Sequence, residues 1–96
     1  MINSIGKSWV KALDSVTTTA TGDSVSSAHT LHSFQFTAGA GTVAFEASLD
    51  GEVWHQLGTS NTPGEIKTFE GAFSYVRAKV TVYTSGSITV TYRGAR

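Results

Sequence analysis

The sequence predicts an all-β protein: a single antiparallel β-sandwich or jelly-roll-like domain of about seven to eight short strands. The clearest sign is the segment 75–83, YVRAKVTVY, in which apolar and polar residues alternate as a half-buried strand requires. A second sign is the Asp50-Gly51 pair between two apolar runs, because glycine tolerates the positive φ of a hairpin turn. No long segment shows the periodicity of an amphipathic helix, and turn-forming residues recur at short intervals.

The first half of the chain is expected to form strands on both sides of a polar loop, the Thr-, Ser- and Gly-rich segment 17–27. Strands are expected over 9–17, briefly around Val25, over 29–38 and over 42–49. A turn at 38–41 separates the last two. Alternation gives these two strands the inward side chains His32, Phe34, Phe36, Val43, Phe45, Ala47 and Leu49.

The second half continues in the same way. Strands are expected over 53–59, 65–70, 75–83 and 87–93, with turns at 61–64 and 85–86. Ile66 is expected to be buried. The long alternating segment places Val76, Ala78, Val80 and Val82 inward and Tyr75, Arg77, Lys79, Thr81 and Tyr83 outward.

Composition limits the classes of function. A chain of 96 residues corresponds to one domain, and without cysteine it has no disulfide to support a small core. Self-association could supply that support by covering sheet edges. Seven basic residues balance seven acidic ones, so no basic surface for nucleic acid is expected. No signal peptide and no apolar run of about 18–20 residues is present, so no membrane partner is expected.

Catalytic and metal-binding patterns are absent from the sequence. The Gly22-Asp23-Ser24 triplet resembles a hydrolase nucleophile motif, but it lies in a Ser-rich loop and no Asp-x-x-His follows. His29 and His32 would point to opposite faces of one strand and could not share an ion. We therefore expect no enzyme activity, no catalytic residue, no metal site and no cofactor.

Aromatic residues are the remaining candidates. We expect Trp54 to fill the core or its rim, because a small domain needs large side chains there. The alternative is that Trp54, with Tyr75 and Tyr83, stacks on a sugar ring at the surface. Trp9 follows the segment 1–8, which we expect to be a flexible arm preceding a 9–96 domain, and it either packs inward or reaches a neighbouring subunit.

Several segments together resemble small β-sandwich virion proteins of tailed bacteriophages. The resemblance extends from about Leu13 to Arg93 and is carried by LDSVTTTATG (13–22), FQF (34–36), VAFEASLDGEVW (43–54), YVRAKVTV (75–82) and GSITV (86–90). Parts of it also look like discoidin-type and carbohydrate-binding sandwiches, which are usually longer. The phage proteins of this group are head decoration, cement or other structural proteins, so the resemblance implies a structural function without catalysis.

The resulting hypothesis is a capsid decoration or cement protein, located in the virion, that binds the major capsid protein and forms a homotrimer. Ile2, Ile5 and Trp9 are the expected contacts of the N-terminal arm with capsid or subunit. Many copies would stabilise the lattice through summed contacts. The alternative is a carbohydrate- or host-surface-binding module on a head fibre or tail.

Overall fold

Seven antiparallel strands make up the protein in the computed structural model, which describes residues 9–95. They are β1 (Trp9–Val16), β2 (Ala20–Thr21), β3 (Val25–Ser26), β4 (Leu31–Ser48), β5 (His55–Ser60), β6 (Ile66–Glu70) and β7 (Tyr75–Ala95). Every pairing between them is antiparallel, and residues 9–95 contain no helix. The all-β prediction is confirmed.

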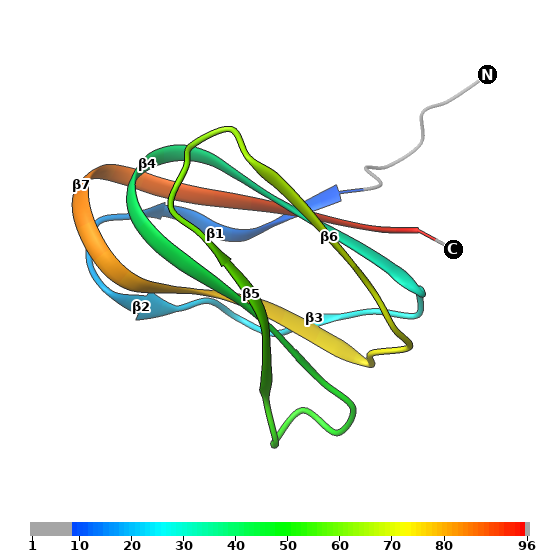
Figure 1. The fold of residues 1–96 in the computed structure, drawn as a ribbon. Helices are drawn as coiled ribbons and strands as arrows, with labels where there is room; N and C mark the ends of the chain where they lie inside the picture. The colour runs from blue at the N-terminus through cyan, green and yellow to red at the C-terminus, as the bar shows by residue number, and fades with distance from the viewer. Residues whose placement is uncertain (1–8, 96) are drawn as a thin grey trace.

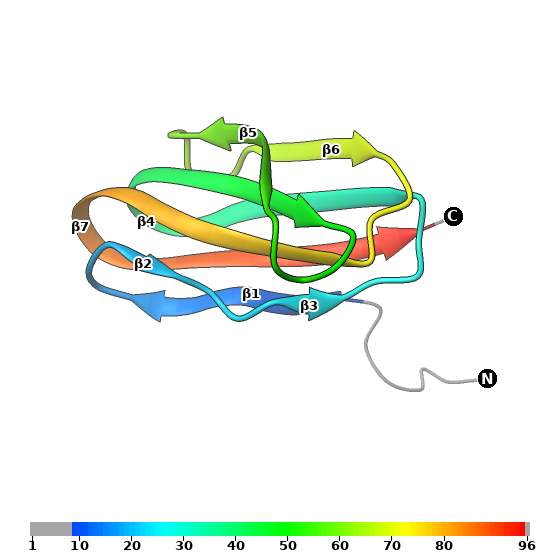
Figure 2. The same ribbon diagram turned by 90° about the horizontal axis from the view of Figure 1, so that it is seen from below.

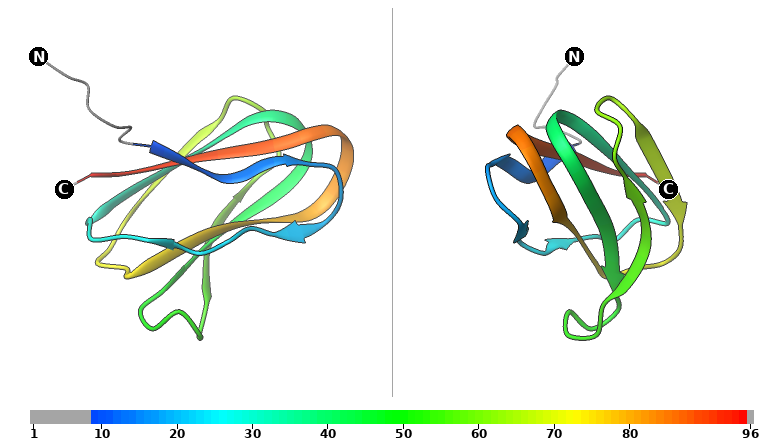
Figure 3. Two further views of the ribbon diagram at one scale, coloured as in Figure 1. Left: turned by 180° about the vertical axis from the view of Figure 1, so that it is seen from behind. Right: turned by 60° about the vertical axis from the view of Figure 1, so that its left-hand side comes forward.

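Two of the strands are unexpectedly long. The predicted strands 29–38 and 42–49 are one strand, β4, and the predicted strands 75–83 and 87–93 are one strand, β7. Both strands bend in the middle, where Ala40 pairs with Ser85, so the bends lie side by side (Figure 3). The sheet therefore folds over on itself.

Each bent strand contributes to two layers. The first layer consists, in order, of β1, the second half of β7, the first half of β4, and β6. The second consists of β2 with β3, the first half of β7, the second half of β4, and β5. This pairing order agrees with a jelly-roll-like sandwich. The strands are labelled in Figure 1, and Figure 2 shows β5 and β6 along one edge and β1, β2 and β3 along the other.

Glycines make the bends possible. Gly39 in β4 has φ +88° and Gly86 in β7 has φ +74°, which L side chains rarely adopt. A Cβ at Gly39 would lie 2.7 Å from the side chain of Ile88, so the two strands approach closely. The pairing of β4 with β7 shifts register at several points between Phe36 and Val43, as bulged and bent strands do.

The core lies between the layers. Phe34 and Phe45 come from the two halves of β4, and their rings stack with centroids 4.6 Å apart. The other buried apolar residues of this cluster are Ala12, Leu13, Phe36, Val43, Ala47, Val76, Ala78, Val80, Ile88, Val90 and Tyr92. Most inward positions predicted by alternation are therefore confirmed.

Four predicted positions are wrong. Leu49 is 70% exposed because it follows the last residue of β4, and Ile66 is 60% exposed because it lies on the outer face of β6. Val82 is 53% exposed, whereas Tyr83 packs against the core. That exchange occurs where β7 begins to cross between layers, opposite an irregularity in β4.

Candidate functional site

A groove lies on the outer face of the first layer, formed by β1, β7, β4 and β6. We call it the first-layer groove; its volume is about 480 Å³ and its lining is Trp9, Ser33, Phe34, Gln35, Ile66, Thr91 and Arg93. The strand register explains why these residues line one groove. Trp9 pairs with Arg93, and Ile66 pairs with Gln35, and all four side chains lie on the same side of the sheet. The groove thus spans the layer from β1 to β6.

Side chains of the groove floor are hydrogen-bonded to neighbouring strands and turns. Ser33 Oγ and Thr68 Oγ1 lie 2.9 Å apart, and Gln35 Nε2 donates to the Gly64 carbonyl at 3.2 Å. These hydrogen bonds hold the polar side chains of the groove in place. The apolar Trp9 and Ile66 stand at its two edges, 38% and 60% exposed.

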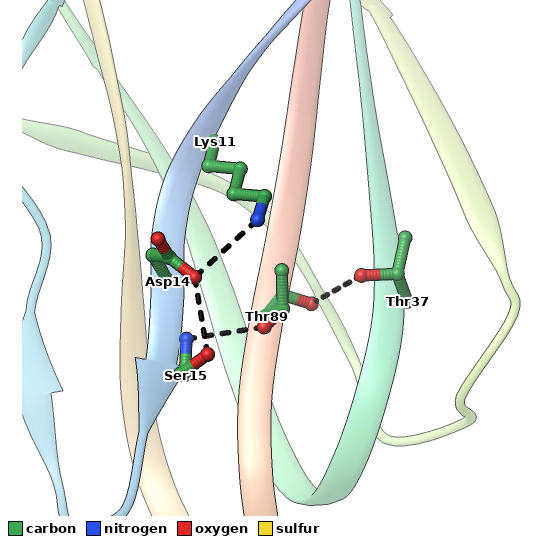
Figure 4. Close-up of polar contacts among 5 residues, drawn as sticks. All are labelled: Lys11, Asp14, Ser15, Thr37 and Thr89. Carbon is green, nitrogen blue, oxygen red and sulfur yellow. Dashed lines mark hydrogen bonds and ion pairs between the residues drawn. The ribbon is translucent and has the colours of Figure 1, made fainter.

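Charge is distributed unequally across this face. Arg93 of β7 and Lys11 of β1 lie near the β1 edge, and Glu70 of β6 lies at the opposite edge. Lys11 Nζ forms an ion pair with Asp14 at 3.5 Å, shown in Figure 4. Arg93 and Glu70 are both exposed, and neither forms an ion pair within residues 9–95.

The β1 edge is irregular just beyond the groove. Ser15 has φ 56°, a conformation uncommon outside glycine, and register shifts occur between Lys11 and Leu13 and between Leu13 and Val16. The Ser15 backbone N–H donates to Thr89 Oγ1 at 3.1 Å (Figure 4). A bulge of this kind bends an edge strand and discourages the addition of a further strand there.

Trp54 is half-buried against Arg77 and does not belong to the core cluster, so of its two predicted places, the core and its rim, the core is wrong. The Arg77 guanidinium lies over its ring, 4.0 Å from the centroid, and Arg77 Nε donates to Glu46 Oε1 at 2.6 Å. Arg77 and Glu46 are paired across β7 and β4. Trp54 therefore covers a half-buried ion pair.

The other two candidate aromatics lie at opposite ends of the first half of β7. Tyr75 pairs with Ser48, and its ring packs against Gly51 of the turn after β4. Tyr83 is partly buried, and its hydroxyl donates to the Gly86 carbonyl at 2.7 Å. Tyr75 and Tyr83 are eight steps apart along the strand, which corresponds to about 26 Å, so Trp54, Tyr75 and Tyr83 do not form one platform.

A second, apolar hollow of about 420 Å³ lies at the turn between β4 and β5. Its lining includes Leu49, Val53, Leu57 and Phe73. Asp50 shapes this turn by accepting hydrogen bonds from the backbone N–H groups of Val53 and Glu52, both at 2.9 Å, and these bonds lower the pKa of its carboxyl below 3.8.

Among residues 9–95, the side chains that could bind a metal ion do not form a cluster. No group of three or more His, Cys, Asp or Glu side chains able to hold a metal occurs among the residues described. The ring of His32 is buried and hydrogen-bonded through both nitrogens. Ile2 and Ile5 lie outside the described residues, and Trp9 lies on the outer face instead of packing inward.

Sequence reasoning did not find the groove residues Ser33, Gln35, Thr91 and Arg93. Alternation marks all four as outward-facing, but it does not show which outward-facing side chains lie next to one another.

Residues 9–95 contain no helix that is long and apolar enough to cross a membrane.

Comparisons with known proteins concern the fold. No family model and no curated protein matches the chain. The fold is similar to that in the crystal structure of SPBc2 prophage-derived protein YomS, with a TM-score of 0.74 over 96% of each chain. The two sequences are 14% identical.

Proposed function

We propose that this chain is a structural protein of a bacteriophage virion, a decoration or cement protein that binds the major capsid protein. The observation that carries the proposal is the shared fold with a prophage-derived protein across 96% of both chains. The segments that resemble phage virion proteins, from Leu13 to Arg93, belong to the same folded unit.

The structure suits a mechanical role. A two-layer sheet with a close-packed aromatic core is a rigid body, and its outer surface offers two shallow hollows suited to protein contacts. Each contact would be weak, but many copies on a symmetric lattice add their binding energies. Bridging neighbouring capsid subunits in this way would resist the pressure of packaged DNA.

Ile2, Ile5 and Trp9 are proposed as the contacts of the N-terminal segment with capsid or subunit. Trp9 is 38% exposed at the start of β1, so the chain preceding it enters the fold beside an exposed aromatic side chain. Apolar side chains of such a segment gain hydrophobic free energy when a neighbour covers them.

The test uses particles of the phage that encodes the chain. Particles purified from a strain lacking the gene are mixed with the purified protein and sedimented, and saturable binding at a symmetric copy number is expected. Restored particles should also lose DNA at a higher temperature than bare ones. Absence of the chain from purified wild-type particles, or failure to bind the bare ones, would refute the proposal.

Glycan binding is less favoured as a function. Arg77 lies over the ring of Trp54, and Tyr83 is distant from Tyr75 along β7. Pull-down with host-cell polysaccharide would separate this role from capsid binding, since a decoration protein binds particles and not the polysaccharide.

A further inference from the structure

We infer that the first-layer groove is a self-association surface, where a second copy of this chain packs face to face through a two-fold axis. This inference goes beyond the proposed function, because it requires neither a capsid nor a phage. It rests on three properties of one sheet face: its apolar edges, its charge distribution and its strand order.

Apolar side chains stand at both edges of the face. Ile66 on β6 is 60% exposed and Trp9 on β1 is 38% exposed, with short polar side chains between them. Two stacked copies would remove both from water. The floor hydrogen bonds of Ser33 and Gln35 lie within one copy, so packing need not break them.

Opposite charges lie in opposite halves of the same face. Arg93 lies on the side of β1, Glu70 lies on β6, and neither has an ion-pair partner within residues 9–95. A half-turn about an axis parallel to the strands places β1 of one copy over β6 of the other. The basic side of each copy then faces the acidic side of its partner, and the same pairing occurs twice.

Because the whole contact surface lies on one face of the sheet, it favours two-fold symmetry over threefold symmetry. Both edges belong to one layer and point the same way, so a single self-complementary contact satisfies both. A threefold ring requires two different patches that face different neighbours. The groove therefore favours a dimer over the trimer expected from the sequence.

The contact is small. Four strands about 4.8 Å apart and five residues of about 3.3 Å give a face of about 14 Å by about 17 Å. This is well below the roughly 800 Å² per partner of a standard interface. We expect a dissociation constant of about 100 µM, weak in solution and effective where a surface concentrates the copies.

Sedimentation equilibrium of the full chain from about 10 µM to about 1 mM tests the inference. The mass should rise from 10.1 kDa toward twice that value. In this dimer, Arg93 on β7 lies over β4 of the partner, next to β6 and its Glu70. Arg93→Glu and Glu70→Arg should each weaken dimerisation about tenfold, because each brings like charges into the same part of the interface. The double variant Arg93→Glu/Glu70→Arg should restore the wild-type constant within about threefold.

Glu52→Arg is the matched control, since it makes the same charge change at an exposed position in the turn after β4. It should leave the constant unchanged. In parallel, amide NMR signals of Ser33, Gln35 and Thr91 should shift with concentration, while those of Glu46 and Gln56 on the second layer should not.

Three results would overturn the inference. They are a mass of 10.1 kDa throughout the concentration range, a limiting mass of three times 10.1 kDa, and a double variant as weak as the single ones. The NMR shifts keep the test decisive if a charge variant fails to fold, because they use the wild-type protein.

Discussion

At the scale of single residues, the most constrained polar group is His32. Its side chain is fully buried, and Nε2 lies 2.8 Å from the Gly71 carbonyl. A carbonyl only accepts, so Nε2 carries a proton, and in the neutral ring Nδ1 accepts from the Tyr92 hydroxyl at 2.6 Å. The Tyr92 oxygen then accepts from Ser27 Oγ at 3.0 Å. This chain joins β4, β7 and two turns.

Tyr92 should make stability depend on alkaline pH. Burial raises its pKa above 10.0, partly opposed by the hydrogen bond from Ser27. A raised pKa in the folded state means that the neutral form stabilises the fold, so this contribution is complete below pH 10.0 and is lost as pH rises through the folded-state pKa. Tyr92→Phe should lower the free energy of unfolding by about 1–3 kcal/mol at pH 7 and reduce the alkaline slope.

Urea unfolding across alkaline pH measures both effects. An alkaline slope in Tyr92→Phe equal to that of the wild type would show that another group causes the dependence.

Core positions give a second prediction at this scale. Phe45 and Val80 are buried and Thr81 is exposed, as the alternation of the sequence predicts. Phe45→Ala and Val80→Ala should each lower the free energy of unfolding by about 2–5 kcal/mol, and Thr81→Ala by less than about 0.5 kcal/mol. Equal losses at Val80 and Thr81 in chemical denaturation would contradict the register.

At the scale of elements, the bends of β4 and β7 determine the architecture. Each strand supplies a segment to both layers, so these two strands provide the two central segments of each layer. A bend at this point needs backbone with positive φ and little side-chain volume, which Gly39 and Gly86 provide.

Gly39→Ala tests the bend, with Gly64→Ala as its control. Both glycines have positive φ, +88° and +93°, but a Cβ at Gly39 would meet Ile88 at 2.7 Å, whereas nothing lies within 4 Å of one at Gly64. We expect Gly64→Ala to cost about 1 kcal/mol of unfolding free energy from backbone strain alone. Gly39→Ala should cost about 2–4 kcal/mol because overpacking is added. Equal costs in urea unfolding would show that the crossing at Gly39 has room for a methyl group.

At the scale of the whole molecule, the strand pairing of the described residues begins at Trp9. β1 pairs with β7 from Trp9 onward, and no described core residue precedes Ala12. We expect the segment 1–8, which lies outside the described residues, to serve as a binding arm.

Deletion of residues 1–8 should leave the β-type circular dichroism spectrum unchanged and the free energy of unfolding within about 1 kcal/mol. Binding to particles lacking the protein should weaken, since Ile2 and Ile5 are lost. Full particle binding and unchanged self-association in the shortened chain would show that the segment is not a docking arm.

Local pattern determined much of this fold. Alternation is a property of one strand, so Phe34, Phe36, Phe45, Val76 and Val80 could be assigned to the interior without knowing their partners. The absence of helical periodicity and the positions of glycine and proline likewise sufficed for the all-β class and most strand boundaries.

Other features depended on which segments meet. Trp54 was expected inside because it is large, yet it lies over Arg77, whose position depends on the pairing of β7 with β4. Ile66 was expected inside because it is apolar, yet β6 is an edge strand and presents it outward. The first-layer groove exists only because four strands bring Trp9 beside Arg93 and Ile66 beside Gln35. A local pattern shows that a side chain faces out, whereas long-range pairing decides what it faces.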